Sequence, residues 1–171
     1  MIISNSSPLI LLAKVNRLEL LKKLYRKVHI PEEVYHEVVI RGKEERYSDA
    51  FIIEREINDS IEVMKVGREY SKEAEGLHRI IGSGESGAIA LAIQERCGLL
   101  LIDNLEPRKI AEAKDIRCRS TPGIALEALA KKVIDHDEYE NLIKGLSGFA
   151  WLSGDIVAHF LEQGYKLKYG K

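Results

Sequence analysis

GSGESGAIALAIQERCGLLLID, residues 82–103, is the stretch that decides the predicted fold. It begins with glycines, continues as an apolar helix, and ends in a short apolar strand, residues 99–102, followed by an acid. In an open parallel α/β sheet, helices run antiparallel to strands, so a helix N-terminus and a strand C-terminus share one edge. We therefore expect Glu85 and Asp103 to meet at the edge where such folds bind ligands. Two carboxylates there indicate a cation site or a proton-transfer site.

Short strands alternate with helices on both sides of this stretch. We expect strands at residues 1–5, 27–30, 60–66, 99–102 and 116–118. Beside the apolar helix of the opening stretch, we expect helices at residues 8–15, 17–24, 31–41, 48–58, 70–81, 107–114, 121–132, 137–144 and 155–163. The alternation predicts a three-layer α/β/α fold around a central, mostly parallel sheet. We expect a single domain over residues 1–171, with a C-terminal helical extension from about residue 135.

The composition excludes several classes of protein. Hydrophobic residues make up 45% of the 171 residues and charged residues 31%, which is typical of a globular chain and not of a disordered one. The net charge of -1 gives no overall attraction to nucleic acid or to a membrane surface. The N-terminus has no basic start, and no apolar run approaches the roughly 20 residues of a membrane span, so we expect a cytoplasmic location and no membrane partner. Cys97 and Cys118 form no CxxC pair, which disfavours zinc.

Any contact with nucleic acid must therefore come from a local patch. Lys22, Lys23, Arg26 and Lys27 form a basic cluster beside the predicted helix 17–24. A solvated helix face is the favoured interpretation of such a short run, and a phosphate contact is the alternative.

Two further polar side chains are expected at the same sheet edge. Asn5 ends the first predicted strand, and Pro8 begins the helix that follows. Glu37 lies in the second turn of the helix that begins at Pro31, where it borders the apolar face. Helical side chains lean toward the N-terminus, so Glu37 is able to reach the edge at which Asn5 lies. The local pattern alone favours an exposed glutamate.

The glycines of the opening stretch allow two interpretations. Gly82, Gly84 and Gly87 form a GxGxxG pattern, which resembles a dinucleotide-binding turn. That turn requires a strand directly before the glycines, and the preceding residues, KEAEGLHRII, look helical. The simpler interpretation is a helix start with Ser83 as the N-cap and Glu85 in the first turn. Asp103 is harder to explain structurally, because a charge at the end of a buried strand needs compensation.

Four segments, in this order and spacing, resemble the PIN-domain superfamily of metal-dependent ribonucleases. They are IISNSSPLILLAK at residues 2–14, PEEVYHEV at 31–38, GESGAIALA at 84–92 and LLLIDN at 99–104. GFAWLS at residues 148–153 is similar to a segment of a PIN-like subfamily of unknown function from bacteria and archaea. Many relatives are toxins of toxin–antitoxin pairs, so the resemblance implies RNA and a cognate antitoxin as partners.

The resemblance also implies a site. Its metal, Mg²⁺ or Mn²⁺, would be bound by Asn5, Glu37, Glu85 and Asp103, of which the three acids would be the catalytic residues. Three further residues, expected to support these ligands or contact the substrate, are Ser6, Asn104 and Arg108. The implied activity is metal-dependent endoribonuclease hydrolysis of RNA phosphodiesters, in which the metal activates water.

Two departures from the family pattern leave an alternative open beside the favoured nuclease. Asn5 stands where active PIN nucleases typically have Asp, and Asn104 stands where relatives often have a second Asp. The alternative is a catalytically weak or inactive PIN module that binds RNA or an antitoxin. Large aromatics gather near the C-terminus, at Phe149, Trp151 and Phe160, and fit core packing or a partner surface equally well. We expect a homodimer.

Overall fold

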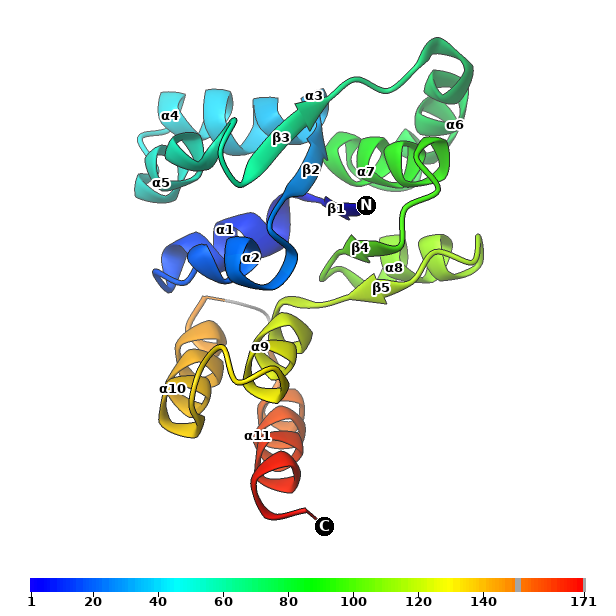
Figure 1. Cartoon of the computed structure of the whole chain (residues 1–171). Coiled ribbons are helices and arrows are strands. Elements are labelled where there is room, and N and C mark those ends of the chain that lie inside the picture. Colours follow the sequence, from blue (N-terminus) through cyan, green and yellow to red (C-terminus); the bar gives the residue numbers. More distant parts are fainter. Residues whose placement is uncertain (150–151, 171) are drawn as a thin grey trace.

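The protein is built on a five-stranded sheet, as its computed structural model shows for residues 1–149 and 152–170. The strands are β1 (Ile2–Ser4), β2 (Val28–Pro31), β3 (Ile61–Met64), β4 (Leu99–Leu101) and β5 (Cys118–Arg119). Their order in the sheet is β3-β2-β1-β4-β5, and every neighbouring pair is parallel (Figure 1). The predicted three-layer α/β/α fold with a mostly parallel sheet is confirmed.

The two central strands show why both faces of the sheet must be covered. Ile3 of β1 pairs with Leu100 of β4, and both side chains belong to the hydrophobic core on one face. Leu99 and Leu101 point the other way and join the core on the opposite face. Side chains alternate along a strand, so a continuous apolar run supplies both cores at once.

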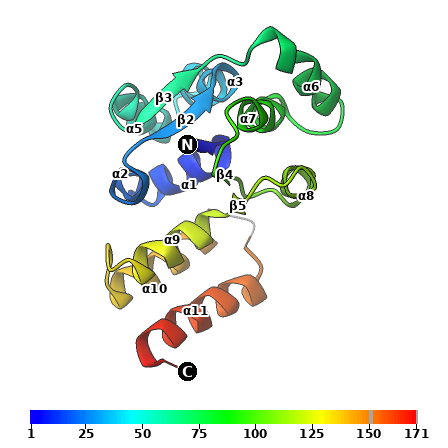
Figure 2. The same cartoon turned by 45° about the vertical axis from the view of Figure 1, so that its right-hand side comes forward.

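Helices cover the two faces of the sheet. The first segments after β1 and β2 are α1 (Ser6–Lys14), α2 (Glu19–Tyr25), α3 (Glu32–Tyr35), η1 (His36–Arg41), α4 (Gly42–Glu44) and α5 (Ser48–Glu56). The helices that follow β3 and β4 are α6 (Arg68–His78), α7 (Ser83–Gln94) and α8 (Leu105–Glu112). Buried residues of α1, α2 and α5 share one core, and those of α7 and α8 share the other. Figures 1 and 2 show α1 and α7 on opposite sides of the sheet.

The chain ends in three helices that pack together below α1 and β5 (Figures 1 and 2). They are α9 (Thr121–Ala130), α10 (His136–Ser147) and α11 (Gly154–Tyr169). Phe160 packs against the core of the α1 face, whereas Phe149 is 57% exposed. Trp151 lies outside the described residues. In the part of the chain that the structure describes, no helix is long and apolar enough to cross a membrane.

The helix predicted at residues 31–41 is not uniform. It is α-helical in α3, π-helical in η1, and α-helical again from Gly42, so Gly42 does not end it. A Cβ at Gly42 would lie 2.8 Å from the Cβ of Ala50, which shows that the glycine allows α5 to pack closely. π-Helical turns are rare and occur often at functional sites, and this one carries Glu37.

Two local details of the glycine segment differ from the expectation. The N-cap of α7 is Gly82, and Ser83 is the first helical residue. The Glu85 carboxylate accepts the backbone N–H of Gly82 at 3.0 Å, which is the contact that the third helical residue makes with the N-cap residue in a capping box. The segment before these glycines is the helix α6, so the dinucleotide interpretation lacks its strand.

Candidate metal centre

The candidate site lies where the strand order changes direction. The chain passes from β1 to β2 and β3 on one side of the sheet, and β4 and β5 lie on the other side of β1. Open α/β sheets bind ligands outside the carboxyl ends of the strands at such a point. Asn5 directly follows β1, and Asn104 lies three residues beyond the end of β4. The N-terminus of α7 reaches the same edge, because Glu85 contacts Asn104.

A pocket of about 190 Å³ opens at this edge. Its lining residues come from the end of β1, η1, the start of α7 and the end of β4, and they are Asn5, Ser6, Ser7, Glu37, Gly82, Gly84, Glu85 and Asn104. The structure thus brings together five of the residues predicted for the site: Asn5, Ser6, Glu37, Glu85 and Asn104.

Glu37 is held in the pocket from two sides. The hydroxyl of Ser6, which is buried, donates to Oε2 of Glu37 at 2.7 Å. A Cβ at Gly84 would lie only 2.5 Å from the same oxygen and 3.2 Å from Oγ of Ser6. The carboxylate therefore occupies space that only a glycine leaves free.

Glu85 is also held by two donors. Its Oε2 accepts the N–H of Gly82, and its Oε1 accepts the side-chain amide of Asn104. An acid in the first turn of α7 is stabilised by the positive end of the helix dipole. Both carboxylates of the pocket therefore have defined positions.

Asn5 contributes a different kind of oxygen. The residue is 1% exposed, and its backbone N–H donates to the carbonyl of Leu101 at 3.1 Å, which ties the end of β1 to β4. Its side-chain Oδ1 is buried and has no hydrogen-bond donor among the described residues. A buried acceptor without a partner costs about 1–3 kcal/mol, and a cation or an ordered water would remove that cost.

Asp103 does not line this pocket. Its two oxygens accept from Thr121, one from the backbone N–H and one from the hydroxyl, each at 2.7 Å. Burial raises the pKa of the Asp103 carboxyl, while the two Thr121 donors and the charge of Arg108 act in the opposite direction. The first turn of α9 has free N–H groups, and Asp103 satisfies one of them. The expected meeting of Glu85 and Asp103 is replaced by a contact between Glu85 and Asn104.

The alternation of side chains along β4 explains why Asp103 and Asn104 point in different directions. Leu99 and Leu101 face the core shared with α1 and α9, and Leu100 and Ile102 face the core shared with α7. Continued by two residues, this alternation sends Asp103 toward α9 and Asn104 toward α7, where Glu85 lies.

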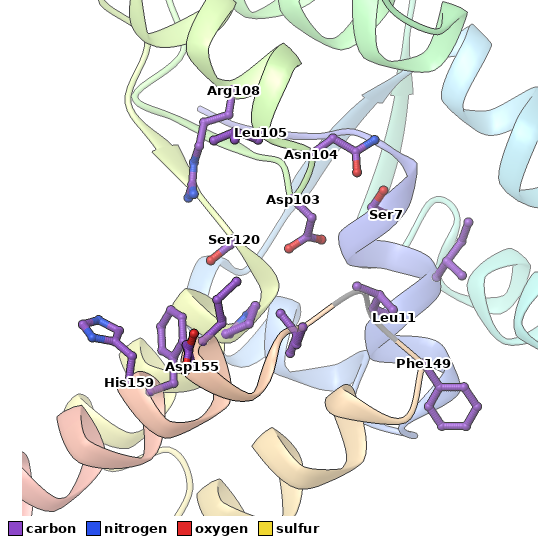
Figure 3. Close-up of a pocket in the computed structure, with 15 residues that line it drawn as sticks. Ser7, Leu11, Asp103, Asn104, Leu105, Arg108, Ser120, Phe149, Asp155 and His159 are labelled. Carbon is purple, nitrogen blue, oxygen red and sulfur yellow. The ribbon is translucent and has the colours of Figure 1, made fainter.

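Arg108 and Asp103 line a second, larger cavity next to the pocket (Figure 3). Glu112, one turn further along α8, lies 3.6 Å from Nε of Arg108. Arg108 therefore does not support the ligands of the pocket directly.

The predicted basic cluster lies at the opposite end of the strands from the pocket. Lys27 directly precedes β2, so it stands at the amino ends of the strands, whereas the pocket is at their carboxyl ends. Lys22 pairs with Asp59 at 2.6 Å and Lys27 with Glu62 at 3.1 Å. The cluster is an ion-paired surface, which agrees with the favoured interpretation of a solvated helix face.

The side chains of the pocket suit a hard cation. Carboxylate, amide carbonyl and hydroxyl oxygens are the donors that Mg²⁺ and Mn²⁺ prefer, and Mg²⁺ is commonly held by only one or two carboxylates. In the described residues, no three His, Cys, Asp or Glu side chains are grouped so that they could hold a metal ion. The pocket has only two such side chains, Glu37 and Glu85; its other oxygen-bearing side chains are two amides and two hydroxyls. The residues present fit a weakly held divalent ion.

A family model described as a PIN domain matches residues 1–164. The chain belongs to the PIN-domain superfamily. PIN domains generally use divalent metal ions, and nuclease activity is the function they imply in general. The match covers the pocket and all the residues that line it. No curated protein and no solved structure matches the chain.

Proposed function

We propose that this PIN domain is a metal-dependent endoribonuclease whose cation is held by Glu37, Glu85 and Asn5. The observation that supports this most strongly is the buried, unpartnered Oδ1 of Asn5 in a pocket that also contains two fixed carboxylates. Asn104 closes the pocket beside Glu85. The two glutamates come from different segments of the chain and line one pocket, so one cation bound there would take oxygen ligands from both.

Each residue of the pocket would have a distinct role in the reaction. Ser6 keeps the Glu37 carboxylate in place, and the Gly82 N–H and the Asn104 amide keep that of Glu85 in place. Mg²⁺ or Mn²⁺ bound there would lower the pKa of a coordinated water and stabilise charge on the scissile phosphate. Two carboxylates balance the charge of one divalent ion, so substrate phosphate and water are needed to complete its ligands.

The proposed substrate is single-stranded RNA, which the pocket would meet through its phosphates. The net charge of -1 gives no long-range attraction, so affinity has to come from contacts close to the pocket.

We also propose that the protein acts as the toxin of a toxin–antitoxin pair and forms a homodimer. The exposed apolar side chains of α11, among them Ile156, Tyr165 and Leu167, support an association surface on the C-terminal helices.

Cleavage of labelled single-stranded RNA with and without Mn²⁺ tests the nuclease. We expect slow, Mn²⁺-dependent cleavage that EDTA stops and that Glu37→Gln and Glu85→Gln each reduce by at least about 100-fold. Glu106→Gln, an exposed acid in the first turn of α8 that lines neither pocket, should cleave like the wild type. Equal rates in all four proteins would refute the assignment.

One observation favours a second candidate, a PIN module that binds RNA or a partner without cutting. Asparagines occupy two corners of the pocket, and Asp103 is engaged by Thr121. In this case RNA should bind equally well in EDTA and in Mn²⁺, and no product should form. The double substitution Asn5→Asp with Asn104→Asp distinguishes the two candidates: a nuclease limited by metal affinity gains rate, and a module that lacks any cleavage path does not.

A further inference from the structure

A second cavity of about 910 Å³ adjoins the candidate metal centre. It lies between the end of β4, α8 and the C-terminal helices (Figure 3). Ser7 and Asn104 line both this cavity and the smaller pocket, so the two lie side by side. A substrate whose phosphate reached the pocket could place its next group in the cavity. The volume falls in the range of sites that enclose small organic groups.

An acid and a base line this cavity without forming an ion pair with each other. Asp103 and Arg108 both line it, and no ion pair of 4.0 Å or less joins them among the described contacts. Figure 3 shows Asp103 at the end of β4 and Arg108 reaching from α8 into the same space, above Ser120. Each Asp103 oxygen accepts one hydrogen bond from Thr121 and retains a second lone pair.

Arg108 has at least one N–H donor that is available to a ligand. Its Nε is buried and makes no hydrogen bond with a described residue. Glu112 is 3.6 Å from that nitrogen, close enough for ionic attraction but not for a hydrogen bond by distance. A guanidinium has five N–H donors in a planar fork, so a ligand with two adjacent acceptors suits it.

The walls of the cavity are mainly apolar. They include side chains of α1, α8, α9 and α11, namely Ile10, Leu11, Leu105, Pro122, Ile156 and Phe160. The rings of His159 and Phe160, which both line the cavity, lie edge to face with centroids 5.5 Å apart. Such walls suit a flat ring with apolar faces and polar edges, as a nucleobase has.

We propose that this cavity binds a guanine base of the RNA whose phosphate lies at the metal centre; the inference rests on the proposed function. Guanine presents the adjacent acceptors O6 and N7, which an arginine binds with two N–H groups. It also presents donors at N1 and N2, which a carboxylate accepts. Arg108 supplies the fork and Asp103 the acceptor. Adenine has a donor amino group where guanine has O6, so it would face Arg108 with the wrong polarity.

Binding of short labelled RNAs in EDTA tests the inference without any cleavage. Each RNA is a run of uridines with one central guanosine, adenosine, cytidine or 7-deazaguanosine. We expect the guanosine RNA to bind roughly tenfold more tightly than the adenosine RNA. Replacing N7 by carbon should remove several-fold of that preference.

Two variants of α8 make the test specific. Arg108→Gln removes the fork, and Lys109→Gln removes the same charge from an exposed neighbour that does not line the cavity. We expect Lys109→Gln to weaken all four RNAs equally and keep the guanosine preference, whereas Arg108→Gln should abolish it. Equal binding of all bases by the wild type, a preference for cytidine, or a preference that survives Arg108→Gln would overturn the inference.

The outcome also separates this inference from the proposed function. A guanosine preference without Mn²⁺-dependent cleavage would keep the base site and reject the nuclease. Cleavage without any base preference would keep the nuclease and reject the base site.

Discussion

Replacing Gly84 by alanine should weaken cation binding while leaving the fold intact. The added Cβ would lie 2.5 Å from Oε2 of Glu37, and ordinary contact begins at about 3.4 Å. The carboxylate oxygen must therefore retreat by about 0.9 Å, or α7 must shift. The oxygen is the end of a flexible, exposed side chain, so the carboxylate is the part that moves. The fold loses little stability, and alanine is the better helix former by up to about 1 kcal/mol.

The loss at the metal centre should be much larger. The new Cβ would also lie 3.2 Å from Oγ of Ser6, which now donates to Glu37 at 2.7 Å. Both the position of one ligand and the hydrogen bond that fixes it are disturbed. Changes to groups that orient a metal ligand typically reduce metal affinity by about 10- to 100-fold, and we expect a loss in that range.

Calorimetric titration with Mn²⁺ and thermal unfolding of the metal-free protein measure the two quantities separately. Gly76→Ala is the matched control, because Gly76 lies inside α6 and its Cβ would meet nothing within 4 Å. The control should gain stability and bind Mn²⁺ like the wild type. Unchanged Mn²⁺ affinity in Gly84→Ala, with the protein folded, would refute the position assigned to the Glu37 carboxylate in the cation site.

Three further predictions concern Asp103 and two residues of the C-terminal helices. Asp103→Ala should lower the free energy of unfolding by about 1–3 kcal/mol, because two buried donors of Thr121 lose their acceptor. The variant should bind Mn²⁺ with unchanged affinity. Normal stability with lost Mn²⁺ binding would make Asp103 a ligand. Gly164→Ala should lower the melting temperature despite its helical position, because its Cβ would lie 2.3 Å from the ring of Tyr139; an increase would contradict this packing. Burial raises the pKa of Glu127, but its hydrogen bonds and the neighbouring cations lower it by more, so the folded pKa lies below the unfolded value, near 4.5. The charged carboxylate therefore stabilises the fold fully above the unfolded pKa, and this stabilisation is lost as the pH falls through the folded pKa. Glu127→Gln should lose less stability on acidification than the wild type, as followed by circular dichroism.

The fold was predictable because its main signals are local. The apolar runs at β1 and β4 do not depend on distant partners, and neither do Pro8 and Pro122 in the first turns of α1 and α9, although α1 begins two residues before the predicted start at Pro8. The change to a π-helix in η1 was not predictable from periodicity, since the residues 31–41 carry an ordinary helical pattern. The role of Gly42 depends on α5, a neighbour that no local pattern reveals.

The candidate site was predictable in part. A shared sheet edge follows from topology, and it brought Asn5, Glu37 and Glu85 into one pocket as expected. The choice between Asp103 and Asn104 depends on side-chain parity, and the acid is the more obvious metal ligand by type. Thr121, which engages Asp103, is distant in the sequence and carries no motif, so the reason for this arrangement appears only in the fold.

The most direct test of the account is whether Glu37 and Glu85 bind one divalent cation together. Titration of Mn²⁺ followed by electron paramagnetic resonance should give saturable binding to the wild type. The double variant Glu32→Gln with Glu106→Gln loses two exposed acids that line neither pocket, and it should bind like the wild type. The account predicts that Glu37→Gln with Glu85→Gln abolishes saturable binding. Unchanged Mn²⁺ affinity in that folded double variant would contradict it.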